Sequence, residues 1–164
     1  MIVVIGSPIG RSSDGAMAAA GPASRVALAA ARAGRSVQLV GRTGDDATAD
    51  GVVLDLARGG VGHVALLRDP ARPTPLEPSL AEEDEAGGSV DDTDPSVLPP
   101  DAATAKGPAL DAADVDLGLR YLTDFADVVL AEPASPETVA IVAEASSWSA
   151  RRATMRRRTR WSWI

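Results

Sequence analysis

Two arginines near the start of the chain have the residue type and position best suited to ligand binding. Arg11 follows the apolar run "IVVIG" at 2–6, and Arg25 lies in the alanine-rich stretch "AAGPASRVALAAARAG" at 19–34. A guanidinium group only donates hydrogen bonds and stays charged, so it suits an anionic ligand. Open α/β sheets bind ligands beyond the carboxyl ends of their strands, which is where Arg11 would lie. One hypothesis is therefore that Arg11 and Arg25 hold an anionic small molecule.

Other chemistries are excluded or disfavoured by the composition. The chain has no cysteine, which excludes disulfides and thiolate sites. Its single histidine, His63, lies in an apolar run without a visible acid–base partner, and we interpret it as a structural or surface residue. The acidic stretch 77–101 lacks the ligand spacing of a calcium loop and is interpreted as a solvated linker. The sequence therefore predicts no metal site and no catalytic residue.

The charge of the chain is divided sharply between its body and its end. The net charge is −7, but residues 151–164 hold six arginines and no acid. Residues 1–150 carry ten basic and 23 acidic side chains, a formal net charge of −13. Because nucleic-acid binding depends on neutralising phosphates, the body should not bind nucleic acid, and only the tail could. The abrupt change of composition after Ala150 favours a frameshifted or truncated end.

Apolar and helix-forming segments alternate in the first 67 residues. Glycine and proline mark several of the boundaries, and acids open the second helical segment. We interpret Asp45 and Asp46, at that opening, as helix-capping residues. The order β-α-β-α-β predicts a parallel sheet with right-handed crossovers. The expected strands are 2–6, 36–41 and 61–67, and the expected helices are 22–34 and 45–60.

The rest of the chain divides into three further parts. Residues 68–109 are rich in proline and acid, which predicts a long acidic loop or disordered linker. Residues 110–150 predict a helix, a fourth strand at 126–133 and a second helix, which would complete the α/β layer. Residues 151–164 form the arginine-rich tail.

Residues 19–67 resemble the N-terminal half of the ribokinase, or PfkB, carbohydrate kinase family. The family signature near the sugar site combines a small residue and a glycine, a further small residue, and two glycines at fixed distances. "VQLVGRTGDD" at 37–46 is similar to the strand and turn that follow in these kinases. The positions that match the signature are Ala20, Gly21, Ala27, Gly34 and Gly44.

The resemblance implies a fold, an activity and a site. The fold would be a ribokinase-like, Rossmann-like parallel sheet with flanking helices, incomplete in this chain. The family phosphorylates sugars or related alcohols using ATP and magnesium. The residues that would line the substrate site are Gly21, Arg25, Asp14, Gly44 and Asp45.

Several departures from the family pattern bear on activity. Arg25 stands where the signature has asparagine, and Arg11 stands where an aspartate follows the first strand, with Asp14 the nearest acid. Residues 7–20 leave no apparent room for the family's lid strands. The chain also ends before a Gly-Ala-Gly-Asp-like turn, which in the family supplies the base and the anion hole. We therefore expect no kinase activity from this chain, with ATP and magnesium implied by resemblance only.

Two alternatives to a reduced sugar kinase follow from the same residues. The first is a non-catalytic α/β module that binds an anionic small molecule through Arg11 and Arg25. The second, a dinucleotide-binding domain, is disfavoured because "VVIGSPIG" at 3–10 lacks the Gly-x-Gly-x-x-Gly pattern.

The expected location and partners follow from the segments that the sequence lacks or leaves unpaired. No apolar run approaches the roughly 18 residues that span a bilayer, and no signal peptide precedes the first strand, which predicts a cytoplasmic protein without membrane contact. The expected partners are a sugar or sugar phosphate. An open sheet edge could also pair with a second copy of the chain to form a homodimer.

Overall fold

A four-stranded parallel sheet forms the centre of the computed structural model, which describes residues 1–13, 15–77, 107–122 and 124–159. The strand order is β5-β4-β1-β6, and all three pairings are parallel. The four strands are β1 (Ile2–Ile5), β4 (Val37–Gly44), β5 (Val61–Asp69) and β6 (Asp127–Leu130). The predicted α/β fold with a parallel sheet and flanking helices is thus confirmed.

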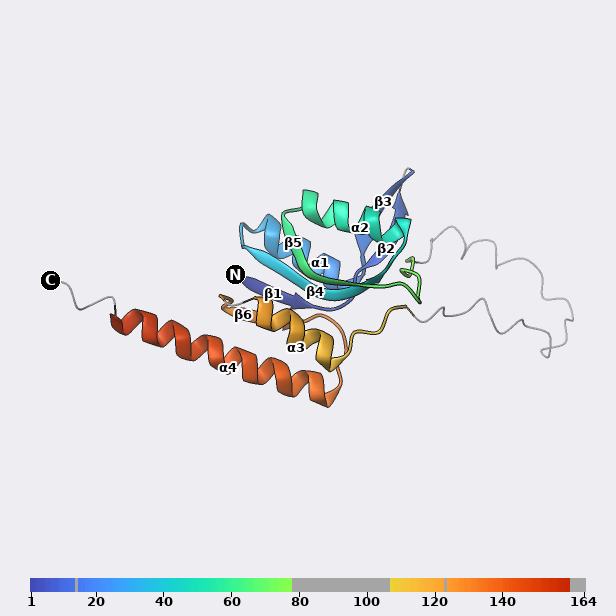
Figure 1. The fold of residues 1–164 in the computed structure, drawn as a ribbon. Coiled ribbons are helices and arrows are strands. Elements are labelled where there is room, and N and C mark those ends of the chain that lie inside the picture. The colour runs from blue at the N-terminus through green and yellow to red at the C-terminus, as the bar shows by residue number, and fades with distance from the viewer. Residues whose placement is uncertain (14, 78–106, 123, 160–164) are drawn as a thin grey trace, which may run out of the picture.

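Two helices cover each face of the sheet (Figure 1). One face carries α1 (Gly21–Arg32) and α2 (Ala47–Arg58), and the other carries α3 (Ala112–Tyr121) and α4 (Pro136–Thr159). The backbone of α4 continues as helix through the first part of the arginine-rich segment, so residue 150 is not a structural boundary. None of the described helices is long and apolar enough to cross a membrane.

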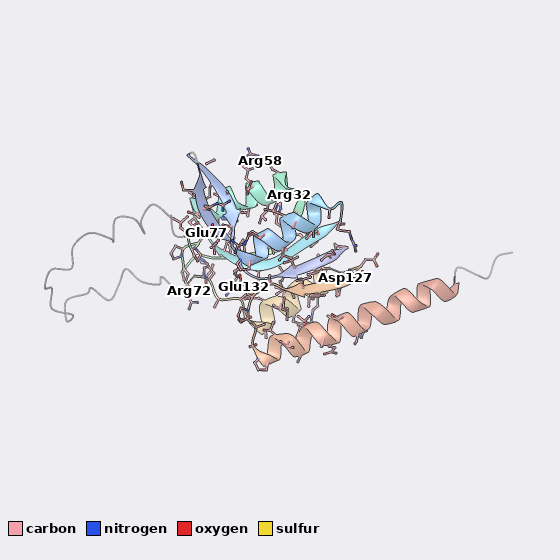
Figure 2. All side chains as sticks on the ribbon, turned by 180° about the vertical axis from the view of Figure 1, so that it is seen from behind. Arg32, Arg58, Arg72, Glu77, Asp127 and Glu132 are labelled. Atoms are coloured by element: carbon pink, nitrogen blue, oxygen red, sulfur yellow. The ribbon has the colours of Figure 1, made fainter. Side chains whose placement is uncertain are left out.

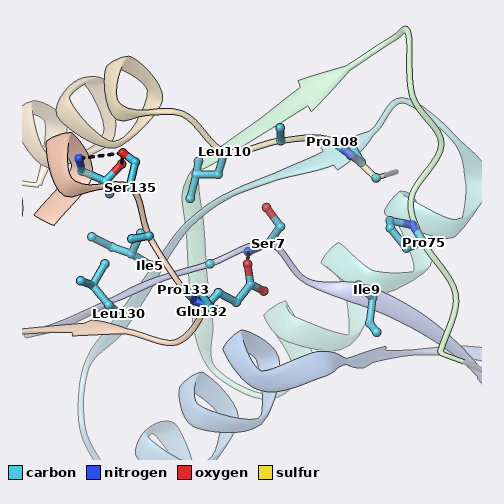
Figure 3. A pocket seen from close by; sticks show the side chains of 15 residues that line it. Ile5, Ser7, Ile9, Pro75, Pro108, Leu110, Leu130, Glu132, Pro133 and Ser135 are labelled. Carbon is cyan, nitrogen blue, oxygen red and sulfur yellow. Dashed lines mark hydrogen bonds between the residues drawn. The ribbon is translucent and has the colours of Figure 1, made fainter. Parts of the chain in front are cut away.

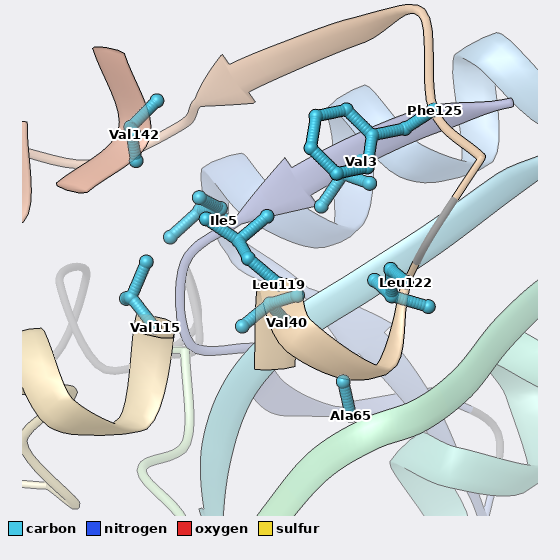
Figure 4. Packing of buried hydrophobic residues seen from close by; sticks show 9 residues of the cluster. All are labelled: Val3, Ile5, Val40, Ala65, Val115, Leu119, Leu122, Phe125 and Val142. Atoms are coloured by element: carbon cyan, nitrogen blue, oxygen red, sulfur yellow. The ribbon is translucent and has the colours of Figure 1, made fainter. Parts of the chain in front are cut away.

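Strand β1 is buried because helices pack on both of its sides. Val3 and Ile5 face α3 and α4, whereas Val4 between them faces α1 and α2, as expected for side chains that alternate along a strand. The first cluster also contains Phe125 and Leu119, shown with their neighbours in Figure 4. The second cluster is built mostly of alanine and valine, which brings α1 close to the sheet. Both clusters hold the ends of β1 and β6 in fixed positions.

The segment between β1 and α1 corrects one expectation. Residues 7–20 do contain strands, β2 (Ile9–Ser13) and β3 (Ala16–Ala20), which pair antiparallel as a hairpin. A hairpin needs only a very short turn between its strands, so the prediction that this segment has no room for strands was wrong. Asp14, which stands between the two strands in the sequence, lies outside the described residues.

The hairpin lies on α2 through small residues. Gly51 of α2 has no side chain, and a Cβ there would collide with Met17 of β3. The side chain of Asp55, one turn further along α2, accepts a hydrogen bond of 2.8 Å from the Ala19 N–H. These contacts fix the hairpin beside the carboxyl ends of the strands. The acidic part of the predicted loop, residues 78–106, lies outside the described residues.

Candidate functional site

The crevice between the ends of β1 and β6 is where this topology places a ligand. After β1 the chain passes through the hairpin to α1 on one face of the sheet, whereas after β6 it passes to α4 on the other face. The two strands are neighbours, with Ile5 paired to Leu130. Connections that leave adjacent parallel strands toward opposite faces open a crevice at their carboxyl ends, and ligands bind there in open α/β sheets.

A cavity of about 390 Å³ occupies this crevice (Figure 3). Its volume is within the range of small-molecule sites. Apolar side chains form most of its wall, and the polar ones come from the chain just after each strand. The segments that line it are 5–7 with Ile9, Pro75, 107–110, and 130–135 with Thr138.

Glu132 is the only ionisable side chain among the described residues that line the cavity. Its Oε2 accepts a hydrogen bond of 3.3 Å from the backbone N–H of Ser7, so the bond joins the segments that follow β6 and β1. Burial penalises the charged carboxylate and raises the pKa of Glu132 above its ordinary 4.5, although the Ser7 N–H partly opposes that shift. The carboxylate therefore lies in the crevice at a cost in stability.

Hydroxyl groups complete the polar part of the cavity. The Ser7 Oγ accepts a 3.3 Å hydrogen bond from the backbone N–H of Arg42. Ser135 precedes α4, and its Oγ accepts a 3.1 Å bond from the Thr138 N–H and lies 3.0 Å from the Thr138 Oγ1. Ser135 is thus the N-cap of α4. Because hydroxyls both donate and accept, this side of the cavity can bind either kind of group.

Close backbone approach shapes the floor of the cavity at Gly6. Its φ is +154°, and a Cβ there would lie 2.9 Å from the Ala23 Cβ and 3.2 Å from the Glu132 Cδ. A side chain at this position would push α1 and Glu132 apart. Glycine therefore lets the chain turn from β1 into the hairpin while Glu132 stays beside it.

Arg42 fixes the segment 107–110, which forms one wall of the cavity. Its Nε lies 3.2 Å from a carboxylate oxygen of Asp114 on α3, which is nearly buried. One terminal nitrogen donates a 3.4 Å hydrogen bond to the carbonyl oxygen of Ala109. Asp114 also forms a capping box with Asp111 at the start of α3. The side chain thus ties β4 to the segment 107–110 that lines the cavity.

None of the predicted substrate residues that the structure describes lines the cavity. Gly21 begins α1 with a φ of +83°, and a Cβ there would lie 3.1 Å from Ile9, which does line the cavity. Arg25 is exposed on α1 and pairs with Glu77. Asp14 lies outside the described residues.

The other two predicted residues, Gly44 and Asp45, lie at the end of β4. The Gly44 N–H donates a 2.9 Å bond to the buried Thr74 Oγ1, and Asp45 is exposed with one oxygen 3.7 Å from Arg68. The neighbouring Asp46 is the N-cap of α2, which confirms its interpretation as a capping residue. The hydrogen bonds of Thr74 to Gly44 and Asp46 hold the loop after β5 against the end of β4.

Sequence reasoning missed the residues that line the cavity. Glu132 and Ser7 are 125 positions apart and become neighbours only because β6 pairs with β1. The available signal was the position of each residue directly after a predicted strand. Polar residues at the carboxyl ends of adjacent parallel strands meet at one edge of the sheet, but the sequence did not establish that these two strands are adjacent.

Comparisons with known proteins give a fold likeness. No protein-family model matches the sequence, and no curated protein matches it by sequence. A ribokinase-like structure from Agrobacterium tumefaciens aligns with 46% of this chain and 30% of its own, at 23% identity and a TM-score of 0.41. The structure of a fructokinase from Xylella fastidiosa with bound ATP aligns over 46% of this chain and 28% of the fructokinase chain, at 25% identity and a TM-score of 0.41.

A third structure covers far more of the chain. The crystal structure of a protein named Sa239 aligns with 91% of this chain and 51% of its own, at 15% identity and a TM-score of 0.58. This alignment establishes a shared fold and nothing further. The chain spans about 30% of the length of the sugar kinases it matches and about half that of Sa239. The expected resemblance to part of ribokinase-like sugar kinases is found in these partial alignments.

Proposed function

We propose that this chain binds a neutral sugar or related alcohol in the cavity between β1 and β6, and that it does not transfer phosphate by itself. The observation that carries the proposal is the half-buried Glu132 carboxylate in an otherwise apolar and hydroxyl-lined crevice at the topological switch point.

The chemistry of the cavity favours a polyol. An ionised carboxylate only accepts hydrogen bonds, and the hydroxyls of a sugar can donate to it, two at a time when they are vicinal. The apolar walls, which include Ile5, Leu130 and Pro108, suit the C–H faces of a sugar ring. An anionic ligand would meet the Glu132 charge at close range in a region of reduced dielectric, which opposes binding.

The described lining residues do not fit a nucleoside triphosphate. Enzymes that transfer a phosphoryl group surround it with cationic side chains or backbone N–H groups and a metal ion. None of the described residues that line this cavity is a lysine or an arginine, and its one charge is negative. Within the described part of the chain, no three histidine, cysteine, aspartate or glutamate side chains gather as a metal site requires. We therefore assign the cavity to binding alone.

The first test is calorimetric titration of the purified chain with neutral sugars and polyols, including ribose, fructose and glycerol. At least one should bind, and Glu132→Gln should weaken that binding about tenfold, because hydrogen bonds to a charged group contribute roughly 1.5–3 kcal/mol. Glu144→Gln is the matched control, since Glu144 is an exposed carboxylate on α4 away from the cavity. It should bind as the wild type does.

Two outcomes would contradict the proposal. The first is a failure of every sugar and polyol to bind, or binding that Glu132→Gln leaves unchanged. The second concerns catalysis and uses the same panel with ATP and Mg²⁺. Transfer of phosphate to any of these compounds, at a rate that Glu132→Gln abolishes, would show that the cavity is an active site.

A further inference from the structure

A cluster of three charged residues lies beside the cavity and is separate from it. Glu77 follows β5, and its two carboxylate oxygens contact different arginines. Oε2 lies 3.4 Å from Arg11 of β2, and Oε1 lies 3.3 Å from Arg25 of α1. The arginine side chains are 56% and 65% exposed, and that of Glu77 is 24% exposed. One carboxylate thus bridges two guanidinium groups that the hairpin and α1 bring together.

The cluster has a net positive charge, because the single carboxylate of Glu77 neutralises only one of the two guanidinium groups. Two guanidinium groups face one carboxylate, whereas residues 1–150 as a whole have a net charge of −13. A local cationic site on an acidic body selects anions that are small enough to reach it. Phosphate groups carry up to two charges and three terminal oxygens, and they pair well with the planar guanidinium fork.

The cluster adjoins the cavity along two chain segments. Ile9 and Pro75 line the cavity, and Arg11 and Glu77 each follow two residues later. In an extended segment, residues two apart lie on one face at a separation of about 7 Å. Backbone hydrogen bonds hold the segments together, from the Gly10 N–H to the Pro75 oxygen at 2.8 Å and from the Glu77 N–H to the Gly10 oxygen at 2.7 Å. Figure 2 shows Glu77 beside the hairpin.

We propose that Arg11 and Arg25 form a phosphate subsite, that Glu77 occupies it when no ligand is bound, and that the ligand is the phosphate ester of a small polyol. The hydroxyl-bearing part lies in the cavity against Glu132, and the phosphate reaches Arg11 and Arg25 beside the cavity. This assignment of the ligand rests on the proposed function of the cavity. It also separates the two charges, because the phosphate lies outside the crevice that Glu132 lines.

Exchange of Glu77 for phosphate requires little rearrangement. Both ion pairs are exposed, and exposed pairs of this kind are weak. The backbone of the segment is held by its own hydrogen bonds to Gly10, so only the Glu77 side chain has to move. Glu77 thereby acts as an internal competitor, which lowers the affinity for the phosphorylated ligand.

The test compares three classes of probe on the same variants. The probes are inorganic phosphate, the neutral sugars ribose and fructose, and their esters ribose 5-phosphate and fructose 6-phosphate. Glu77→Gln removes the competing charge and should tighten inorganic phosphate and at least one ester about three- to tenfold. Arg25→Gln and Arg11→Gln should each weaken the binding of inorganic phosphate and of that ester about tenfold. Neutral sugars should bind these variants as they bind the wild type.

Two control variants accompany these measurements. Arg35→Gln removes an exposed arginine that pairs with Asp127, at the opposite end of the sheet, and should change no affinity. Thermal unfolding of every variant checks that each one folds, and all the substituted residues in the cluster lie on the surface.

The results separate this inference from the proposed function. Affinities for phosphate and for the esters that do not respond to Glu77→Gln or Arg25→Gln would overturn the subsite. Esters that bind no more tightly than inorganic phosphate would overturn the assignment to a phosphate ester. Absence of neutral-sugar binding, with phosphate still responding to Glu77→Gln, would count against the cavity function while leaving the subsite standing.

Discussion

Glu132 illustrates how a side chain at a proposed binding site can oppose stability. It is held beside Ser7 and Gly6 in a crevice where its charge is poorly hydrated, which raises its pKa. A residue selected for stability alone at this position would be uncharged. Strain and unfavourable charge persist in folded proteins mainly where a site needs them. The cost of Glu132 therefore agrees with its assignment to ligand binding.

The pKa shift of Glu132 predicts a specific dependence of stability on pH. Because the folded state holds the proton more tightly than the unfolded state, stability should fall as pH rises from about 4.5 through the raised folded pKa. Glu132→Gln removes this fall. Its melting temperature should match that of the wild type at pH 4 and exceed it at pH 7. A melting temperature below that of the wild type at pH 7 would contradict the assignment.

At the scale of elements, Asp46 joins a helix to a loop and a strand end. Its Oδ1 accepts a 2.7 Å bond from the Ala49 N–H in the first turn of α2, and its Oδ2 accepts a 2.7 Å bond from the Thr74 N–H. Burial alone would raise the pKa of Asp46, but these bonds and the Thr74 hydroxyl outweigh it, so the pKa falls below 3.8. One carboxylate thus fixes the loop that leads to Pro75 at the cavity.

Asp46→Ala should lower the free energy of unfolding by about 1–2 kcal/mol, the usual cost of losing an N-cap. The folded pKa of Asp46 is lowered, so its contribution is present above pH 3.8 and is lost as pH falls through the folded pKa. The difference between wild type and variant should therefore shrink in acid. Asp45→Ala is the matched control and should change stability by less than about 0.5 kcal/mol, since Asp45 is exposed. Urea titrations at pH 7 and pH 3 measure both.

The sequence predicted most helices and strands, but it did not predict which of them lie next to each other in the fold. The strands at 37–44 and 61–69 and the helix between them follow from apolar periodicity and caps such as Asp46. The hairpin at 9–20 was missed because its strands consist largely of small and polar residues, without the β-branched alternation that marks a strand. Its order comes from packing on α2. The contacts with α2 therefore order the hairpin, although its sequence has no strand-like pattern.

At the scale of the whole molecule, the site depends on strand order. Neither Ser7 nor Glu132 stands out in the sequence, and the cavity exists only because β6 pairs with β1 and not with β5. Local patterns carry no information on which of several parallel strands are adjacent. Apart from Asp14, the suggested substrate residues followed a family signature whose match ends at Gly44, and so they lie on α1 and at the end of β4.

The open edges of the sheet support one prediction about assembly. β5 is an edge strand, and its Val64 is 72% exposed. Unpaired strand edges with apolar side chains favour pairing with another chain. The expected homodimer should therefore form at high concentration and be weakened by Val64→Lys, measured by light scattering. A monomer at all concentrations for the wild type would contradict it, and Leu54→Lys, on the exposed side of α2, is the control.

The pairing of β1 with β6 also has a consequence for how the protein is made. Ile5 is synthesised 125 residues before its partner Leu130. At about 5–20 residues per second, this separation corresponds to a delay of about 6–25 s. During that time β1 can pair with β4 on one side only. The nascent chain therefore carries an incomplete crevice, and one edge of β1 is unpaired, until translation has passed residue 130.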